Sequence, residues 1–284
     1  MQTKQRASGT SWPQLQQLVR GGGPAHKRKL CKQIALPTFQ GARTSSSTSK
    51  GARNVACNNF SVNNLSSLAG IQDEQYAEGA FRTVHLGTYK NGPREGEKCV
   101  AKWFKDGPVY DNKFFSKDLN AVDKAQEIIN KFNDEGIISQ RVYLNRPAVW
   151  VFAPESDWAG QKHLVEPFIP NYQKFNSNTG VQMGDDGWPA AMQALSHFSY
   201  HTTGGRYVLC DLQGGVMDGG KSVILTDPVI LSRDREFGVT DLGSEGISTF
   251  FARHNCTKFC REHWHQPRKQ LIYFGANVGT TMMM

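Results

Sequence analysis

The chain has 284 residues, of which 38% are hydrophobic and 11% aromatic, so it holds enough apolar material for a large buried core. Mean hydropathy is −0.51 and no apolar run approaches the roughly 18 residues of a membrane span, which disfavours an integral membrane protein. Six cysteines spread over a chain of this length exclude a small secreted domain held together by disulfides.

The positive charge is concentrated near the start of the chain. Net charge is +8, from 33 Lys and Arg against 25 Asp and Glu. Residues 1–70 hold ten of the basic residues and no acid, which leaves 23 basic and 25 acidic residues in the remainder. With nearly equal numbers of basic and acidic residues, 71–284 does not resemble a dedicated nucleic-acid-binding domain, which carries its positive charge on the surface of the fold.

Residues 1–70 are predicted to be a disordered, basic tail rich in Ser and Gly, because such a composition cannot bury enough surface to offset chain entropy. The basic run at 26–29 is a solvated patch, a localisation signal or a contact for an acidic partner. An acid-free, Ser-rich stretch is also typical of organelle transit peptides. We expect a cytoplasmic protein, with nuclear or organellar placement left open by the tail.

The body is predicted to begin with strands and to continue as a mixture of helices and strands. Alternating apolar residues and turn-forming residues indicate a strand, turn and strand over 76–89, a hairpin turn over 91–97 and further strands over 99–104, 149–153, 163–169 and 206–212. Apolar residues at helical spacing predict a helix over 119–132, and further helices are expected over 190–201 and 247–260.

Lys102 is the first candidate for chemistry, because a Lys inside an apolar strand needs a partner and phosphate oxygens are one such partner. The turn at Gly79 lets backbone N–H groups approach phosphates, and Arg82 adds a charged fork. A glycine turn followed by a strand Lys is typical of nucleotide sites in protein kinases. Glu166 and Phe168 end a strand where a hinge facing an adenine is one interpretation, and an edge strand capped by Pro is the other.

Oxygen ligands follow a strand in the second half. Asp211 and Gln213 come directly after an apolar strand, and Asp227 lies fourteen residues beyond Gln213. Carboxylate and amide oxygens suit Mg²⁺, which binds one or two carboxylates together with substrate phosphates. One acid would then serve the acceptor hydroxyl, although an Asp at a turn is also a common cap.

A second group of residues has the spacing of metal ligands. His254, Cys256 and Cys260 form H-x-C-x₃-C, and on a continuous helix the two cysteines would face the same side. The fourth ligand of a tetrahedral site is open at this point, with His197, His201, His263 and His265 as candidates. Free cysteines in a core and a catalytic zinc are the alternatives.

Residues 215–222 match a P-loop formally, G-V-M-D-G-G-K-S. A P-loop follows a buried strand and opens a helix. Because residues 223–225 read as a strand, we expect an inserted hairpin here.

Taken in order, these motifs resemble the alpha-kinase family, the atypical protein kinases that include myosin heavy chain kinases and elongation factor 2 kinase. The resemblance covers about residues 74–264. The matching segments are G-A-F-R (79–82), V-A-K-W-F (100–104), E-P-F-I (166–169), K-F-N-S-N-T-G (174–180), S-H-F-S-Y (196–200), C-D-L-Q-G (210–214), L-T-D-P (225–228), F-G-x-x-x-L-G (237–243) and G-I-S-T-F-F-A-R-H-N-C-T-K-F-C (246–260).

The resemblance implies an α+β fold of two lobes, a strand-rich N-lobe over 71–170 and a mixed, zinc-containing C-lobe over 171–284. It implies a Ser/Thr protein kinase that uses Mg-ATP and protein substrates. The implied catalytic residues are Lys102 and Asp211. The implied ATP contacts are Gly79, Ala80, Phe81, Arg82, Lys102, Glu166 and Phe168.

The resemblance also assigns the metals and a substrate loop. Magnesium ligands would be Gln213 and Asp227, and a structural zinc would be held by His197, His254, Cys256 and Cys260. The loop with Gly238, Asp241 and Gly243 would contact peptide substrate. The middle glycine of the usual G-x-G-x-x-G is here Thr240, whose Cβ disfavours positive φ. This departure motivates one alternative, a catalytically weak pseudokinase; the other is a zinc-stabilised binding module with a basic tail.

Overall fold

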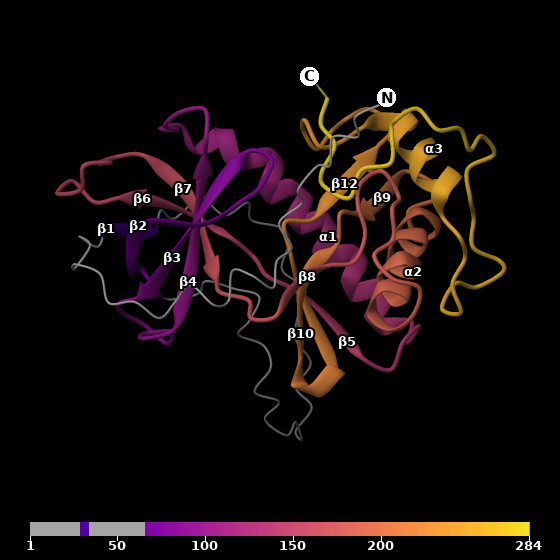
Figure 1. Ribbon diagram of the computed structural model, residues 1–284, viewed down its shortest axis with the longest axis horizontal. Helices are drawn as coiled ribbons and strands as arrows, with labels where there is room; N and C mark the ends of the chain where they lie inside the picture. Colours follow the sequence, from indigo (N-terminus) through magenta and orange to yellow (C-terminus); the bar gives the residue numbers. More distant parts are fainter. Residues whose placement is uncertain (1–28, 34–65, 284) are drawn as a thin grey trace, which may run out of the picture.

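The computed structural model describes residues 29–33 and 66–283, which form two lobes lying side by side (Figure 1). The strands are β1 Lys29–Gln33, β2 Leu68–Glu78, β3 Arg82–Tyr89, β4 Lys98–Phe104, β5 Arg141–Leu144, β6 Ala148–Phe152, β7 Lys162–Pro167, β8 Tyr172–Lys174, β9 Tyr207–Cys210, β10 Gln213–Met217, β11 Ser222–Thr226 and β12 Val229–Ser232. The helices are α1 Ser116–Asp134, α2 Gly187–Thr202 and α3 Gly243–Arg253, with 3₁₀ turns η2 Asn112–Phe115 and η3 Asp218–Gly220.

The N-lobe is a closed barrel with the strand order β1-β2-β3-β4-β7-β6. Side chains alternate along β4, and its residues Cys99, Ala101 and Trp103 lie in the barrel core with Trp150 and Phe152. The intervening residues of β4, among them Lys102, therefore point out of the barrel. The alternation thus places a buried lysine outside the apolar core.

Strand β1 lies within the range that the sequence analysis assigned to a disordered tail. It pairs antiparallel with β2 on one side and with β6 on the other, and this closes the barrel. Its backbone hydrogen bonds come from strands far away in the sequence, which the local composition did not reveal. The rest of that tail, 1–28 and 34–65, and most of the basic run at 26–29 lie outside the described residues.

The lobes do not divide along the chain at residue 170, as the predicted ranges 71–170 and 171–284 would have it. The buried face of α1 packs into the core of the C-lobe, and β5 pairs in parallel with β11. The chain therefore enters the C-lobe at α1, returns to the barrel for β6 and β7, and crosses again between β7 and β8 (Figure 1). Helix α1 joins both lobes, because Phe115 and Leu119 near its start pack against the barrel residues Val149 and Leu164.

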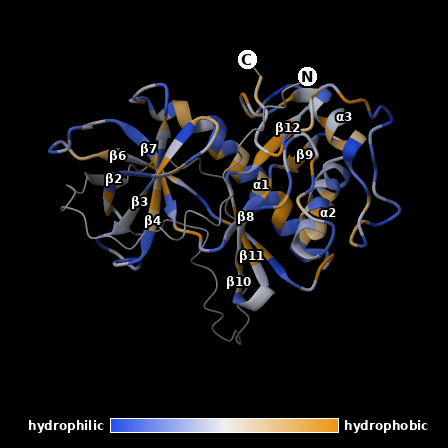
Figure 2. Cartoon of the chain, viewed as in Figure 1, coloured by the Kyte–Doolittle hydropathy of each residue, from blue (hydrophilic) through white to orange (hydrophobic). Residues whose placement is uncertain are grey.

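The C-lobe holds the sheet β5-β11-β10-β8 and the strand pair β12-β9, with α2 and α3 packed around them. Figure 2 shows hydrophobic residues gathered along β9 and β12 in this lobe and along the crossing strands of the barrel. Strands β10 and β11 form a hairpin with η3 at its tip, and no helix follows residues 215–222. The expectation of a hairpin in place of a P-loop is confirmed.

Helix α3 is shorter than predicted. It ends at Arg253, where His254 adopts an extended backbone conformation with ψ of 119°, so Cys256 and Cys260 do not lie on a helix as expected. The predicted helix over 119–132 is confirmed by α1, whose buried residues include Val122, Ile128 and Phe132. Among the described helices, none combines the length and the apolar character that crossing a bilayer requires.

Candidate active site

Three strands of the C-lobe sheet bring distant residues together. Lys174 of β8, Gln213 of β10 and Thr226 of β11 are direct cross-strand partners, so their side chains share one face of the sheet. Asp211 lies two residues before β10 begins to pair at Gln213, and Asp227 directly follows Thr226. The register therefore places both acids at the same end of the sheet.

Lys102 reaches this end of the sheet from the barrel. Its Nζ lies 2.5 Å from Asp227 Oδ2 and also forms an ion pair with Glu166. Glu166 is held in turn by Thr226, whose hydroxyl donates to Glu166 Oε2 at 2.8 Å. Because Lys102 pairs with Leu164 in the β4–β7 register, Glu166 is its diagonal neighbour on the same face. The ion pair to Asp227 thus joins the two lobes.

The pKa shifts in this cluster show which of its groups stay charged. Burial alone would lower the pKa of Lys102, but Asp227 and Glu166 outweigh burial and raise it. Burial would raise the pKa of Asp227, but the bond to Lys102, with Arg82 and Lys174 nearby, holds it below its usual value. For Glu166 burial prevails over Lys102, and its pKa is raised. Asp227 is therefore the firm anion, and Glu166 is the carboxylate closer to taking up a proton.

Asp211 lies beside this cluster with its side chain 1% exposed. The Lys174 ammonium is 2.9 Å from Asp211 Oδ1, and the Thr280 hydroxyl donates to Asp211 Oδ2 at 2.8 Å. Gln213 lies within 3.5 Å of the same carboxylate. An acid held this way by one cation can accept a proton from a hydroxyl group placed against its second oxygen.

The backbone around the two acids is unusual. Asp211 and Asp227 both have positive φ, 58° and 47°, a region that few residues other than glycine enter. Gly214 is required by close approach, because a Cβ there would lie 1.9 Å from the carbonyl oxygen of Ile224. The glycine of the D-L-Q-G segment (211–214) therefore allows the backbone of β10 to pack closely against β11.

The predicted phosphate turn lies at the start of β3. Gly79 N–H donates to the Arg82 carbonyl at 2.8 Å, which closes the turn around Ala80 and Phe81. Arg82 bonds Asp118 in the first turn of α1 at 2.6 Å and stacks over the ring of Phe104. Arg82 is thus positioned by α1, and its charge still lowers the pKa of Asp227.

Phe168 lies in the segment that crosses between the lobes. Its backbone N–H donates to the Lys98 carbonyl at 3.1 Å. The centre of its ring lies 6.1 Å from the centre of the Tyr76 ring and 5.7 Å from the Lys98 ammonium, both in the barrel. The Glu166 carboxylate points to Lys102, so its prediction as an adenine contact has no separate support from this geometry.

The loop predicted to contact peptide runs from β12 to α3. Gly238 and Gly243 have positive φ, 91° and 70°. The Asp241 side chain is fully buried and accepts hydrogen bonds from Ser232 and from the backbone N–H groups of Phe237 and Gly243. Asp241 therefore holds the shape of the loop, and Val239 within it is 52% exposed.

The four predicted zinc ligands converge in the C-lobe. Ligand atoms of His197, His254, Cys256 and Cys260 all lie within 4.8 Å of one another. Between them, His254 Nε2 to His197 Nδ1 is 3.2 Å, Cys256 Sγ to His197 Nδ1 is 3.7 Å and Cys260 Sγ to His254 Nε2 is 3.9 Å. A tetrahedral zinc with ordinary bond lengths needs edges of about 3.3 Å between nitrogens and about 3.5 Å from nitrogen to sulfur. The four residues fit such an ion.

The protonation of this His/Cys cluster also fits a cation. Burial lowers the pKa of His197 to about 4 and that of His254 to about 3, so both rings are neutral near pH 7. The remaining ring nitrogen of His197 lies 3.2 Å from the His265 carbonyl, which leaves Nδ1 for the cluster. Burial raises the pKa of the Cys260 thiol to about 11, and a bound cation would be needed to remove that proton.

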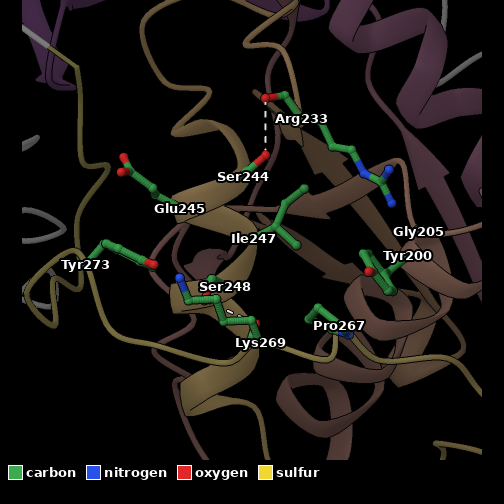
Figure 3. Close-up of a pocket in the computed structure, with 10 residues that line it drawn as sticks. All are labelled: Tyr200, Gly205, Arg233, Ser244, Glu245, Ile247, Ser248, Pro267, Lys269 and Tyr273. Atoms are coloured by element: carbon green, nitrogen blue, oxygen red, sulfur yellow. Dashed lines mark hydrogen bonds between the residues drawn. The ribbon is translucent and has the colours of Figure 1, made fainter.

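A pocket in the C-lobe lies apart from both groups of residues. It is lined by Tyr200, Arg233, Ser248, Lys269 and Tyr273, among others, between α3 and the chain that follows the His/Cys cluster (Figure 3). None of the predicted site residues lines it. The residues predicted to bind phosphates and to accept a proton lie instead where the lobes meet.

Four further residues of the site were not assigned by sequence reasoning. Lys174 belongs to the K-F-N-S-N-T-G segment, which was a signal for it, and Thr226 belongs to L-T-D-P. Asp118 and Thr280 had no signal, because their roles depend on contacts with residues far away in the sequence.

Comparison with known proteins supports the same identification. A sequence profile of the alpha-kinase family matches residues 77–260. Alpha-protein kinase vwkA of Dictyostelium discoideum is 28% identical over 206 residues, 71% of this chain and 32% of that protein. Alpha-protein kinase 1 of the same organism is 33% identical over 187 residues, 65% of this chain and 13% of that protein. The chain thus spans a third or less of these relatives.

Solved structures agree in fold. An alpha kinase from Entamoeba histolytica superposes with a TM-score of 0.61 at 20% identity, covering 76% of this chain and 85% of that one. The alpha-kinase domain of myosin heavy chain kinase A in complex with AMP gives 0.58 at 23% identity, covering 68% and 88%. The family profile covers well over half of the chain, so the chain belongs to the alpha-kinase family.

Proposed function

We propose that this chain is a protein kinase that transfers the γ-phosphate of Mg-ATP to a Ser or Thr hydroxyl of a protein. The observation that carries the proposal is the ion pair of Lys102 with Asp227 across the lobes, with Asp211 and its partner Lys174 at the same end of the C-lobe sheet. Phosphoryl transfer depends on placement and on charge neutralisation more than on covalent chemistry by the protein. This group of residues supplies both, and its completeness disfavours the pseudokinase and binding-module alternatives.

Lys102 would bind phosphate oxygens, exchanging one of its two carboxylate partners for the substrate. The turn at Gly79 and the guanidinium of Arg82 would lie on the barrel side of the same phosphates, with Ala80 and Phe81 in the turn. Glu166 and the chain at Phe168 would border the base. These roles rest on the resemblance and on the position of β4 and β7 beside the crossing segment.

Asp211 would orient the acceptor hydroxyl and take its proton, because one of its oxygens already receives a hydroxyl hydrogen bond while Lys174 neutralises the other. Gln213 and Asp227 would hold Mg²⁺, and their amide and carboxylate oxygens are the ligands that this ion prefers. When bound, the ion would neutralise phosphate charge. The Asp227 side chain is 35% exposed, which leaves it open toward such an ion.

His197, His254, Cys256 and Cys260 would hold a structural zinc. All four ligand positions come from the protein, which is typical of a structural site and leaves no open position for a reactive water. The ion would fix the chain between α3 and the C-terminal segment against α2.

The test is incorporation of radiolabelled phosphate from ATP into a generic basic protein, with and without Mg²⁺. We expect Mg²⁺-dependent transfer, and we expect Asp211→Asn to reduce its rate by about 10³-fold, within the range for a lost general base. The matched control is Asp218→Asn, an exposed acid in the β10–β11 hairpin, which should transfer phosphate at the wild-type rate.

Two results would count against the proposal. Absence of transfer by a folded, ATP-treated wild-type protein would reject the kinase activity. Equal rates for Asp211→Asn and the wild type would reject Asp211 as the proton acceptor while leaving the activity in place.

A further inference from the structure

The pocket beside α3 has a volume of about 300 Å³ and lies on the C-lobe (Figure 3). Its lining comes from α2 and the turn after it, from the segment after β12, from the first turns of α3 and from residues 267–273. None of the lining residues belongs to the proposed active site or to the His/Cys cluster. The pocket is therefore a concave surface, at the lower end of the size of small ligand sites, that the proposed function does not use.

Two basic side chains line the pocket, and their charged ends are not used to hold the fold. Within the part of the chain that the structure describes, Arg233 and Lys269 form no ion pair with an acid. Their backbone carbonyls accept hydrogen bonds from the hydroxyls of Ser244 at 3.3 Å and Ser248 at 3.2 Å. The backbone at both positions is thus held in place, while the guanidinium and the ammonium group are available to a ligand.

The acid that lines the pocket is already neutralised from outside it. Glu245 Oε2 lies 3.3 Å from the guanidinium of Arg235, which does not belong to the lining. The charges of Arg233 and Lys269 are therefore left uncompensated. A ligand with negative charge would gain from both of them, and guanidinium and ammonium groups both form charge-assisted hydrogen bonds with carboxylates.

The wall between the two cations is apolar. Ile247 is buried, and Figure 3 shows it between Arg233 and Lys269. Where the chain leaves the pocket, the three consecutive apolar residues of 271–273 are between 44% and 61% exposed, and the last of them also lines the pocket. Exposed apolar side chains that gather beside a pocket are typical of an interaction surface.

The order of these groups, a cation, an apolar wall and a second cation, limits what can occupy the pocket. A peptide segment with an apolar side chain between two acidic residues would contact all three. A lone phosphate would leave the apolar wall without a partner, and a flat anionic membrane would contact the rim and leave the cavity unfilled. Residues 1–70 of this chain hold ten basic residues and no acid, so the two cations would repel them.

We propose that this pocket is a docking site for another protein, which it recognises by an apolar side chain flanked on both sides by acidic residues. Arg233 and Lys269 bind the two carboxylates, and the apolar side chain packs against Ile247. The inference goes beyond the proposed kinase function and does not depend on it, because the pocket is separate from the active-site residues.

The test is the binding of a fluorescein-labelled peptide to the purified full chain, followed by fluorescence anisotropy. The peptide carries Glu-Ser-Leu-Ser-Glu between flanks of Gly and Ser, an order that places the three recognised side chains on one face of an extended chain. We expect saturable binding that weakens with added salt. Replacing the leucine by glycine should weaken binding about tenfold, as expected for an apolar side chain that is buried on binding.

Variants of the protein locate the site. Arg233→Gln and Lys269→Gln should each weaken binding about tenfold, through the loss of one charge-assisted hydrogen bond. The matched control is Arg268→Gln, which removes the same charge from the exposed neighbour of Lys269 outside the pocket and should change binding less than about twofold. Glu245→Gln removes the acid from the lining and should tighten binding. Thermal unfolding reports whether each variant folds, and the peptide series requires no change in the protein.

Several results would overturn the inference. Equal losses in Arg268→Gln and Lys269→Gln would show general attraction to a basic surface. Absence of saturable binding up to about 1 mM peptide would show that the pocket does not recognise this pattern. Tighter binding of a peptide with one phosphoserine and no glutamate would assign the pocket to a phosphate. Binding of phosphatidylserine vesicles without binding of the peptide, lost in the same variants, would assign it to a membrane. None of these measurements involves phosphate transfer, so they stand if the proposed function fails.

Discussion

Two clusters of ionisable groups in this molecule are stabilised in opposite ways. Lys102, Glu166 and Asp227 neutralise one another across the lobes. His197, His254, Cys256 and Cys260 have no charged partner among themselves; burial instead lowers the pKa of both imidazoles.

The difference indicates which kind of ligand each cluster suits. In the Lys102, Glu166 and Asp227 cluster the opposite charges already neutralise one another, so a ligand binds by replacing one of the partners. In the His/Cys cluster both imidazoles are neutral near pH 7 and the four ligand atoms lie within 4.8 Å of one another, so a bound cation would supply the charge that the cluster lacks. The first cluster therefore suits a substrate that comes and goes, and the second suits an ion that stays.

Removal of the proposed zinc is expected to have the largest effect. We expect about one zinc per chain, and we expect Cys256→Ser or a strong chelator to lower the unfolding temperature by about 10 °C or more, because a structural zinc contributes several kcal/mol to the folded state. Metal analysis and thermal unfolding of the same samples provide the measurement.

The control is His201→Ala, which lies one helical turn beyond His197 on α2 and outside the four-residue cluster. This variant should keep its zinc and most of its stability. A metal-free protein whose unfolding temperature is unaffected by chelator would show that the cluster is a set of packed core residues.

Loss of the lysine is expected to have the next largest effect. Lys102→Met leaves Glu166 and Asp227 close together without their cation, and we expect a loss of about 3 kcal/mol in the free energy of unfolding, at the lower end for a broken buried pair because Asp227 is 35% exposed. Phosphate transfer should be lost as well. Urea unfolding measures the first effect and the radiolabel assay the second.

The loss of stability should shrink below pH 5, where the two carboxylates can take up protons. Arg141→Met, an exposed basic residue of β5, is a control for the loss of one positive charge and should be close to neutral. A loss of the same size at every pH would contradict the pairing.

The sequence predicted local elements well and long-range pairing poorly. Helix α1 follows from its apolar spacing, and the β3–β4 hairpin from its turn residues. Strand β1 did not stand out, because it is five residues long and its partners lie far away along the chain. The early end of α3 carries no Gly or Pro as a signal; the chain leaves the helix at His254, and the two sulfurs meet the two imidazoles through a turn.

The candidate site shows the same division. The motifs located Lys102, Asp211 and Asp227, and their meeting follows from strand register that no local pattern contains. The adenine contact expected of Glu166 stays a prediction, and its ion pair with Lys102 follows from the diagonal β4–β7 register, which no motif contained. The path of residues 270–283 depends on hydrogen bonds between side chains and a backbone without helix or strand. Such contacts leave no periodic pattern in the sequence from which the path could be predicted.

The smallest expected effect distinguishes Glu166 from Asp227, the two carboxylates that pair with Lys102. The pKa of Glu166 is raised from 4.5, so the folded state binds this proton more tightly than the unfolded state. Its contribution to stability is fully present below pH 4.5 and is lost as pH rises through the folded value. Glu166→Gln cannot titrate, and the stability of the wild type relative to this variant should therefore fall as pH rises above 4.5, measured by urea unfolding between pH 4.5 and 8.

Asp227→Asn is the matched comparison, because the pKa of Asp227 is lowered from 3.8 and its contribution is lost only as pH falls below that value. Between pH 4.5 and 8 its difference from the wild type should therefore stay constant. If the two variants exchanged these behaviours, Glu166 would be the firm anion that holds Lys102. Asp227 would then be the partner that yields, and the lysine would stay with the barrel when a substrate's phosphates arrive instead of remaining tied to the C-lobe.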